Sequence, residues 1–419
     1  MNKIKINSYS CENDTIKTVI AVSGDAEFMS MFREAESELK LRYSIKLKDI
    51  PYSLGVIPAL SVLLPVAWIF DAEIECDELD KAFYDGIDGI KTGYIDMYPT
   101  MQFKGKVSPG KIVENKTDGE KCLVLFSGGV DAFNTLASHY SEKPEFLTIW
   151  GVDIAPENET GWSVVKKQVE DISGIFSLEY NFVHTNCRRI LDEKKLNSYI
   201  VAFDSLYNWW HDFQHGICII SHSVPLAYSK GMNTVYIASS YTADDKGTYT
   251  CASDPTIDNK FRFSWSIVVH DGFEFNRQQK IENICKFREK TGKDIPLRVC
   301  YESKTGDNCC RCVKCYRTIL EILAEGADPA ALGFDLFNDK RRKKMMKDLK
   351  IFRIPTYRRL YQITQKRLRE VYTHENCPKD LLWFYDMDIV VNKKTKAKKF
   401  FRYKRKFMRG CTKLFGIRW

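Results

Sequence analysis

Two groups of residues in this chain have the types and spacing needed for chemistry. The first is Ser127-Gly128-Gly129-Val130-Asp131, which follows the apolar run Cys122–Phe126 and precedes the helix-like segment Ala132–Tyr140. A strand, a glycine turn and a helix start can hold a phosphate, because the glycines let the backbone approach and the first helical amides point at the anion. The Ser127 hydroxyl is a further donor, and Asp131 can orient a Mg²⁺ ion or a hydroxyl. An ordinary turn between strand and helix is the alternative interpretation.

The second group is a run of cysteines. Cys300, Cys309, Cys312 and Cys315 have the spacing C-x8-C-x2-C-x2-C. The close steps let neighbouring thiolates converge on one ion, and four thiolates with no open position indicate a structural zinc site. A cluster of reduced thiols without metal is the alternative. Cys310 is left over and is interpreted as a neighbour of the site.

Both motifs carry a resemblance to a known superfamily. The loop lacks the Gly-Lys-Ser/Thr of a Walker motif, and it resembles the SGGxDS loop of the PP-loop ATP pyrophosphatases. The cysteine spacing downstream of the loop resembles that of the 7-cyano-7-deazaguanine synthases within this superfamily. The resemblance covers about residues 119–325. Two departures are Ala132, where the family has Ser or Thr, and Cys310, where it usually has Gly.

The resemblance implies an activity and its cofactors. A carboxylate would attack the α phosphate of ATP, pyrophosphate would leave, and a nitrogen nucleophile would displace AMP. ATP, Mg²⁺ and Zn²⁺ are the implied cofactors, and the enzyme would be an ATP-dependent ligase forming a C–N bond with an unidentified acceptor. A tRNA thiolation enzyme and a non-catalytic nucleotide-binding protein with a decayed loop remain as alternatives. The nucleotide-binding residues are expected to be Ser127, Gly128, Gly129, Val130, Asp131, Ala132 and Asp153.

Two further site residues come from positions at the ends of strands. Asp153 follows the predicted strand Phe146–Gly151, and Arg277 follows the apolar stretch around Val268. Ligands of doubly wound sheets bind beyond the carboxyl ends of the strands. We therefore expect Asp153 near the nucleotide, and Arg277 together with Asp131 in the chemistry. A capping aspartate and a solvated arginine are the alternatives.

The remaining elements indicate an α/β fold. Predicted strands alternate with predicted helices, which is typical of a doubly wound parallel sheet. The resemblance makes this sheet one of the PP-loop, adenine nucleotide alpha hydrolase-like, type. The predicted strands are Phe146–Gly151, Ser177–Val183 and Thr234–Ala238, and the predicted helices are Ser163–Ile172 and Cys218–Lys230.

A chain of 419 residues is expected to form two or three domains. An N-terminal α+β module is predicted for residues 1–118, with a strand at Thr18–Ser23, a helix at Ala26–Leu39 and a buried helix and strand edge within Val56–Phe70. The ATP-binding domain with its zinc loop follows at residues 119–325. Residues 326–419 are predicted to be helical, with helices at Asp339–Leu349 and Tyr357–Tyr372.

Charge sets the C-terminal segment apart. Asp339–Trp419 has 26 Lys and Arg against 7 Asp and Glu, a net charge of +19 in a chain whose total is +8. The end, Lys393–Trp419, is basic with interleaved aromatic residues, so it is expected either to contact nucleic acid or an anionic membrane, or to be a solvated tail. The sequence does not decide whether the chain forms a homodimer. Fourteen cysteines, no signal peptide and no span of about 20 apolar residues favour the cytoplasm.

Overall fold

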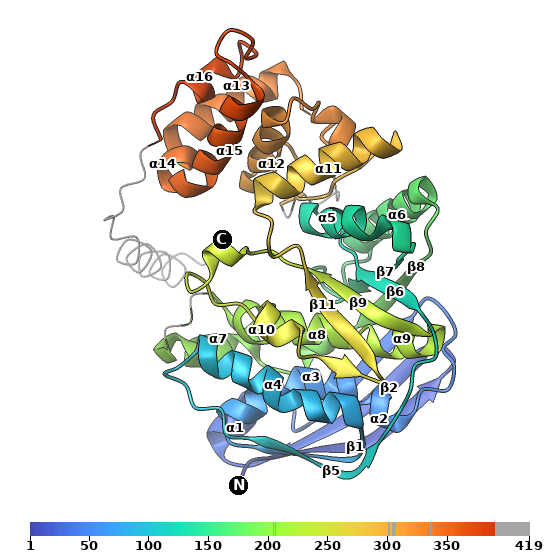
Figure 1. Cartoon of the computed structure of the whole chain (residues 1–419). Helices are drawn as coiled ribbons and strands as arrows, with labels where there is room; N and C mark the ends of the chain where they lie inside the picture. Colours follow the sequence, from blue (N-terminus) through green and yellow to red (C-terminus); the bar gives the residue numbers. More distant parts are fainter. Residues whose placement is uncertain (204, 206, 301, 304–306, 336, 390–419) are drawn as a thin grey trace. The chain divides into compact units, whose positions relative to one another are not determined.

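The computed structural model describes residues 1–389 except 204, 206, 301, 304–306 and 336 (Figure 1). The chain forms two compact units, Met1–Arg341 and Arg342–Trp419. The predicted domain boundaries at residues 118 and 325 both fall inside the first unit. The basic tail Lys393–Trp419, expected either to contact a polyanion or to be solvated, lies outside the described residues.

One 11-stranded sheet runs through the first unit, in the order β10-β11-β9-β6-β7-β8-β3-β2-β1-β4-β5. Its strands are β1 (Lys3–Glu12), β2 (Thr15–Ser23), β3 (Glu36–Tyr43), β4 (Glu73–Asp80), β5 (Lys106–Val113), β6 (Lys121–Leu125), β7 (Glu145–Trp150), β8 (Tyr180–Thr185), β9 (Met232–Ala238), β10 (Arg262–Phe263) and β11 (Ser266–Asp271).

Helices surround this sheet and make up the described part of the second unit. They are α1 (Ala26–Ser30), α2 (Tyr52–Gly55), α3 (Ile57–Ile69), α4 (Lys81–Met97), α5 (Val130–His139), α6 (Glu159–Phe176), α7 (Glu193–Tyr199), α8 (His215–Ser221), α9 (Val224–Lys230), α10 (Pro255–Asp258), α11 (Arg277–Thr291), α12 (Val313–Ala324), α13 (Asp339–Asp348), α14 (Ile354–Thr356), α15 (Arg358–Val371) and α16 (Leu382–Tyr385).

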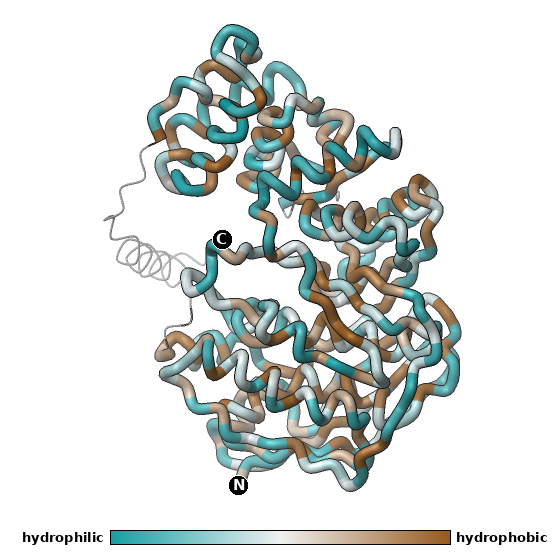
Figure 2. The backbone as a smooth tube through the Cα atoms, in the orientation of Figure 1, coloured by the Kyte–Doolittle hydropathy of each residue, from teal (hydrophilic) through white to brown (hydrophobic). Residues whose placement is uncertain are grey.

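The middle of the sheet is a parallel block. Strands β11, β9, β6, β7 and β8 are all paired in parallel. Helices α5 and α6 lie on one face of this block, and α8 and α9 lie on the other (Figure 1). Because parallel strands are covered on both faces, their residues form apolar runs such as Cys122–Leu125 (Figure 2). The predicted α/β class is confirmed at this level.

The N-terminal residues extend the same sheet. Strand β3 pairs antiparallel with β8, with Leu41 opposite Thr185 and Tyr43 opposite Val183. The packing is also continuous, because the Tyr94 hydroxyl donates to the Phe213 carbonyl over 2.8 Å, and both side chains are fully buried. Residues 1–118 are therefore α+β in content, as predicted, and share one sheet and one core with the parallel block.

Most predicted elements are present, and three are wrong in form. The strand edge predicted within Val56–Phe70 is absent, because helix α3 runs from Ile57 to Ile69. The predicted helix Ala26–Leu39 is a short helix, α1, followed by β3. The alternate residues Leu39, Leu41 and Tyr43 are buried, which is the two-residue period of a strand. The predicted helix Cys218–Lys230 is divided into α8 and α9. Pro225 lies in the first turn of α9, where a proline is tolerated because that amide has no helical partner.

The second unit is described from Arg342 to Ile389 and is helical. Its α15 agrees with the predicted helix Tyr357–Tyr372, and α13, which begins in the first unit, agrees with the predicted helix Asp339–Leu349. Tyr361 and Leu368 of α15 and Phe384 of α16 are buried, and the two helices are in contact. None of the helices in the described ranges is both long enough and apolar enough to span a bilayer.

Candidate active site

The candidate site lies where the chain direction across the sheet reverses. From β6 the chain proceeds to β7 and β8 on one side, whereas β9 and β11 lie on the other side of β6. The connections after β6 and β9 therefore diverge beyond the carboxyl ends of these strands, which is where doubly wound sheets bind ligands. The SGGVD loop, Ser127–Asp131, follows β6 at this point, and Ser239 follows β9.

Backbone conformation explains the first glycine of the SGGVD loop. Gly128 has φ +73°, in the left-handed region that side chains disfavour, although a Cβ would have space there. Gly129 is extended and caps α5, which starts at Val130. Ser127 is exposed, and its hydroxyl accepts a long, 3.4 Å hydrogen bond from the Gly129 amide. The predicted strand, glycine turn and helix start are thus present.

Arg298 holds the loop from the other side. Its backbone amide donates to the Gly128 carbonyl over 2.7 Å, and its guanidinium Nη2 donates to the Ser127 carbonyl over 3.0 Å. Burial lowers the pKa of Arg298, and Asp153 opposes that shift. Arg298 therefore fixes two carbonyls of the SGGVD loop and brings a positive charge beside it.

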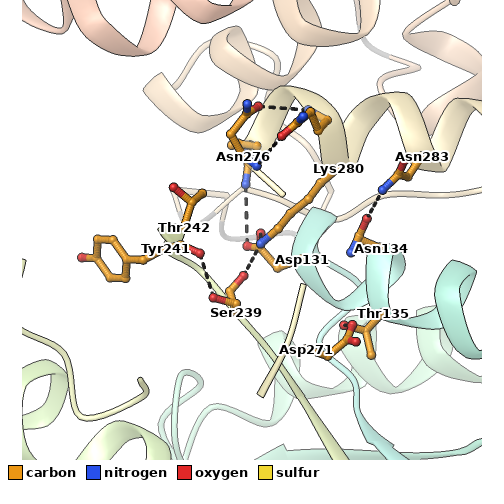
Figure 3. Close-up of polar contacts among 12 residues, drawn as sticks. Asp131, Asn134, Thr135, Ser239, Tyr241, Thr242, Asp271, Asn276, Lys280 and Asn283 are labelled. Carbon is orange, nitrogen blue, oxygen red and sulfur yellow. Dashed lines mark hydrogen bonds and ion pairs between the residues drawn. The ribbon is translucent and has the colours of Figure 1, made fainter. Parts of the chain in front are cut away.

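Asp131 faces two cations on α11. Its Oδ1 lies 3.1 Å from Nζ of Lys280, and its Oδ2 lies 3.7 Å from Nη1 of Arg277. The Lys280 Nζ also donates to the Ser239 carbonyl after β9 (Figure 3). Burial by itself would raise the pKa of Asp131, but the Lys280 and Arg277 charges outweigh it and hold the pKa below its usual range. Asp131 is thus a carboxylate that joins the loop after β6 to α11, and Lys280 continues the link to Ser239 after β9.

The start of α11 explains why these cations point at the loop. The Asn276 side chain accepts from the Gln279 amide over 3.1 Å, and the Gln279 side chain accepts from the Asn276 amide over 2.9 Å. This reciprocal capping box fixes the first helical turn (Figure 3). Arg277 and Lys280 are three residues apart, so they share the face of the helix that meets Asp131.

Helix α12 orients Arg277. The Arg277 Nη2 donates to the Thr318 hydroxyl over 3.0 Å, and its Nε donates to Glu321 over 3.1 Å. The other Glu321 oxygen accepts from Nε of Arg317 over 2.8 Å. The Glu321 side chain is 1% exposed, so a buried carboxylate holds two arginines in place.

Several cations gather at the site. Lys314 lies near the start of α12, between Cys312 and Cys315. Burial is the main cause that lowers the pKa of Lys314, Arg277 adds to the effect, and Asp153 and Asp131 oppose it. Five cations thus lie among four carboxylates, and the cations suit a phosphate chain. The cations are Arg277, Lys280, Arg298, Lys314 and Arg317, and the carboxylates are Asp131, Asp153, Asp271 and Glu321.

The other predicted nucleotide-binding residues take different positions. Asp153 is exposed and follows the carboxyl end of β7, just as the SGGVD loop follows the carboxyl end of the parallel strand β6, so both lie at the same edge of the parallel block. The side chains of Val130 and Ala132 are 1% and 3% exposed. Only their backbone groups are therefore available to a ligand.

The four predicted cysteines converge. All four Sγ atoms lie within 4.8 Å of one another, with 3.8 Å between Cys300 and Cys312 and 3.9 Å between Cys309 and Cys315. Sulfurs around a tetrahedral ion with Zn–S bonds of about 2.3 Å are roughly 3.8 Å apart. The cluster therefore fits a metal such as zinc. Cys310 points its thiol at the Asn308 carbonyl and has φ +49°, a conformation that favours glycine.

Asp131 does not offer a free carboxylate to Mg²⁺. Both of its oxygens are in ion pairs with Lys280 and Arg277. These contacts fit a role in aligning the cations better than a role as a metal ligand, and Mg²⁺ readily binds through phosphate oxygens and water instead.

Sequence reasoning missed several residues of the site. Lys280, Arg298 and Lys314 were not predicted, although Arg298 precedes Cys300 by two residues, Lys314 lies between Cys312 and Cys315, and Lys280 lies one helical turn after Arg277. Asp271, at the end of β11, turns away to other partners. It accepts from the Thr135 hydroxyl over 2.7 Å and lies 2.9 Å from Nε2 of His139 (Figure 3).

Comparisons with protein-family models, curated proteins and solved structures find no match to this chain.

Proposed function

We propose that this chain is an ATP-dependent ligase of the PP-loop type, similar to the 7-cyano-7-deazaguanine synthases. It would cleave ATP to AMP and pyrophosphate, activate a carboxylate as an acyl adenylate and pass the acyl group to a nitrogen nucleophile. The observation that carries the proposal is the pairing of Asp131 with Lys280 and Arg277 at the switch point of the sheet. Cations held there in advance can stabilise the charge of a departing pyrophosphate.

In this proposal each residue has a defined part. The SGGVD loop and the first turn of α5 bind the phosphates through backbone amides. Arg277 and Lys280 neutralise the pyrophosphate, and Asp131 keeps both cations aligned in its absence. Mg²⁺ enters with ATP, bound to phosphate oxygens. The Cys300, Cys309, Cys312 and Cys315 cluster holds zinc in a structural role.

The test is a product assay on the full chain. Zinc-loaded protein is incubated with ATP, Mg²⁺, ammonium and a panel of carboxylic acids, and AMP, ADP, phosphate and pyrophosphate are quantified. We expect AMP and pyrophosphate in equal amounts. Asp131→Asn should abolish their formation, because the cations lose their alignment. Asp171→Asn removes the same charge on the exposed surface of α6 and is the matched control.

The products discriminate between the alternatives. Release of ADP and phosphate would overturn the PP-loop assignment. ATP binding without any AMP across the panel would instead favour a non-catalytic nucleotide-binding protein, in which Ala132 marks the loss of a phosphate contact.

A further inference from the structure

The cysteine cluster and the SGGVD loop are connected through two short segments. One precedes the first cysteine and carries Arg298. The other is α12, which is capped by the third cysteine, Cys312, and contains the fourth, Cys315. Both segments end on groups that contact the loop or its cations.

The segment that carries Arg298 is hydrogen-bonded to the residue before Cys309. The Asn308 side chain accepts from the amides of Val299 and Cys300 over 3.0 and 3.2 Å and donates to the Leu297 carbonyl over 2.7 Å. Asn308 is 5% exposed and immediately precedes Cys309. The position of Arg298 against the loop therefore depends on how Cys300 and Cys309 are held.

The second segment begins at the cluster itself. Cys312 caps α12, and its Sγ accepts from the Cys315 amide over 3.4 Å. Two turns further along the helix, Thr318 and Glu321 hold the guanidinium of Arg277. A helix is stiff over this length, so a fixed first turn transmits its orientation to Glu321.

We propose that Glu321 is a positioning residue, and that metal binding by the four cysteines raises the affinity of the SGGVD loop for pyrophosphate and ATP. The inference rests on the proposed function and adds a link between its metal and its nucleotide. The metal fixes Cys300 and the start of α12. The segment before Cys300 then determines the position of Arg298, and α12 determines the orientation of Arg277. By thermodynamic linkage, pyrophosphate must then raise the affinity for zinc by the same factor.

The substitution Glu321→Gln should change the affinity for pyrophosphate in opposite directions, depending on whether Glu321 positions Arg277 or acts only through its charge. Glu321→Gln removes a buried negative charge beside two arginines. Coulomb attraction alone would make this variant bind an anion more tightly. If Glu321 orients Arg277, the variant instead binds pyrophosphate about tenfold more weakly, because a charge-assisted hydrogen bond is lost. Glu289→Gln removes the same charge at an exposed position of α11 and is the matched control.

The experiment uses calorimetry with magnesium pyrophosphate and magnesium ATP on the full chain. Zinc-loaded protein, metal-free protein and zinc-loaded Glu321→Gln are compared, with zinc content measured in each. Zinc affinity is measured by chelator competition with and without pyrophosphate. We expect at least about tenfold weaker pyrophosphate binding without metal, and a matching gain in zinc affinity when pyrophosphate is present. Glu321→Gln should keep one zinc per chain and bind pyrophosphate more weakly, whereas Glu289→Gln should bind like the wild type.

Three other results of this experiment would each contradict a different part of the proposal. Equal or tighter pyrophosphate binding by zinc-loaded Glu321→Gln overturns the positioning role, and this arm needs no metal removal. Equal zinc affinity with and without pyrophosphate overturns the proposed coupling between metal binding and pyrophosphate binding. A wild-type protein that binds zinc but neither pyrophosphate nor ATP overturns the proposed function itself.

Discussion

Nζ of Lys280 lies 3.1 Å from Oδ1 of Asp131, although 149 residues separate the two in the chain. The lysine side chain is 2% exposed, so it is a buried cation with a defined anionic partner. The pair spans the point where the connections after β6 and β9 diverge. A phosphate bound at this point would meet a positive group already held in place, with little reorganisation needed.

Replacement of this lysine should abolish the reaction. Lys280→Met keeps the length of the side chain but removes the charge, and we expect pyrophosphate release to fall by about 10²–10³-fold. Lys286→Met changes an exposed lysine on the same helix and should leave the rate unaltered. Pyrophosphate release is measured under single-turnover conditions. A wild-type rate in Lys280→Met would remove this residue from the site.

The cysteines provide a matched pair for the metal prediction. Cys312→Ser should lose zinc and unfold at a lower temperature, because metal binding and folding are coupled. Cys310→Ser should retain one zinc per chain, since the Cys310 thiol contacts backbone carbonyls and belongs to no ligand set. Elemental analysis and thermal unfolding give both results. Full zinc retention in Cys312→Ser would contradict the assignment of the cluster.

His139 makes stability depend on pH. Its Nδ1 lies 2.7 Å from Glu142 and its Nε2 lies 2.9 Å from Asp271. Burial lowers the pKa of His139, but the two carboxylates outweigh it and raise the pKa above the ordinary 6.5. A raised pKa stabilises the fold fully below the unfolded value of 6.5, and this contribution is lost as pH rises through the folded value.

The pH dependence is measured by urea unfolding of the wild type and His139→Gln. We expect the wild type to be more stable by on the order of 1 kcal/mol at a pH of about 6, and the difference to shrink toward a pH of about 8.5. A difference that grows with pH would show that the imidazole is neutral in the folded protein.

The shared sheet predicts that residues 1–118 cannot be removed. A fragment of residues 119–419 would expose the β8 edge and leave the Phe213 carbonyl without the Tyr94 hydroxyl. We expect this fragment to show no cooperative thermal transition by circular dichroism. Cooperative unfolding of the fragment would show that the N-terminal residues are an independent module.

Local signals in the sequence were sufficient for the strand, loop and helix around Asp131 and for the convergence of the four cysteines. In both cases the residues that come together in space are close in the sequence, so their spacing alone predicts the local arrangement. Strand β3 was missed because its polar and apolar residues were included in a longer helical pattern, and only its pairing with β8 selects the two-residue period.

The cations of the site were harder to predict, for a physical reason. Lys280 is ordinary among the charged residues of α11, which appears largely hydrophilic (Figure 2). Its burial arises from the docking of α11 beside α5, and that contact depends on the whole order of the sheet. Arg277 was predicted from its position after a strand. Its orientation by Glu321 depends on α12, which no local pattern reveals.

The two outer strands of the sheet limit how copies of this chain can associate. At one end, β10 has two residues, too few to template a further strand. At the other end, β5 contains Pro109, which lacks an amide hydrogen, and the exposed Lys106 and Lys111 flank it. Edge-to-edge growth of the sheet is therefore disfavoured at both ends, and a homodimer of this protein would have to be built from helices or loops.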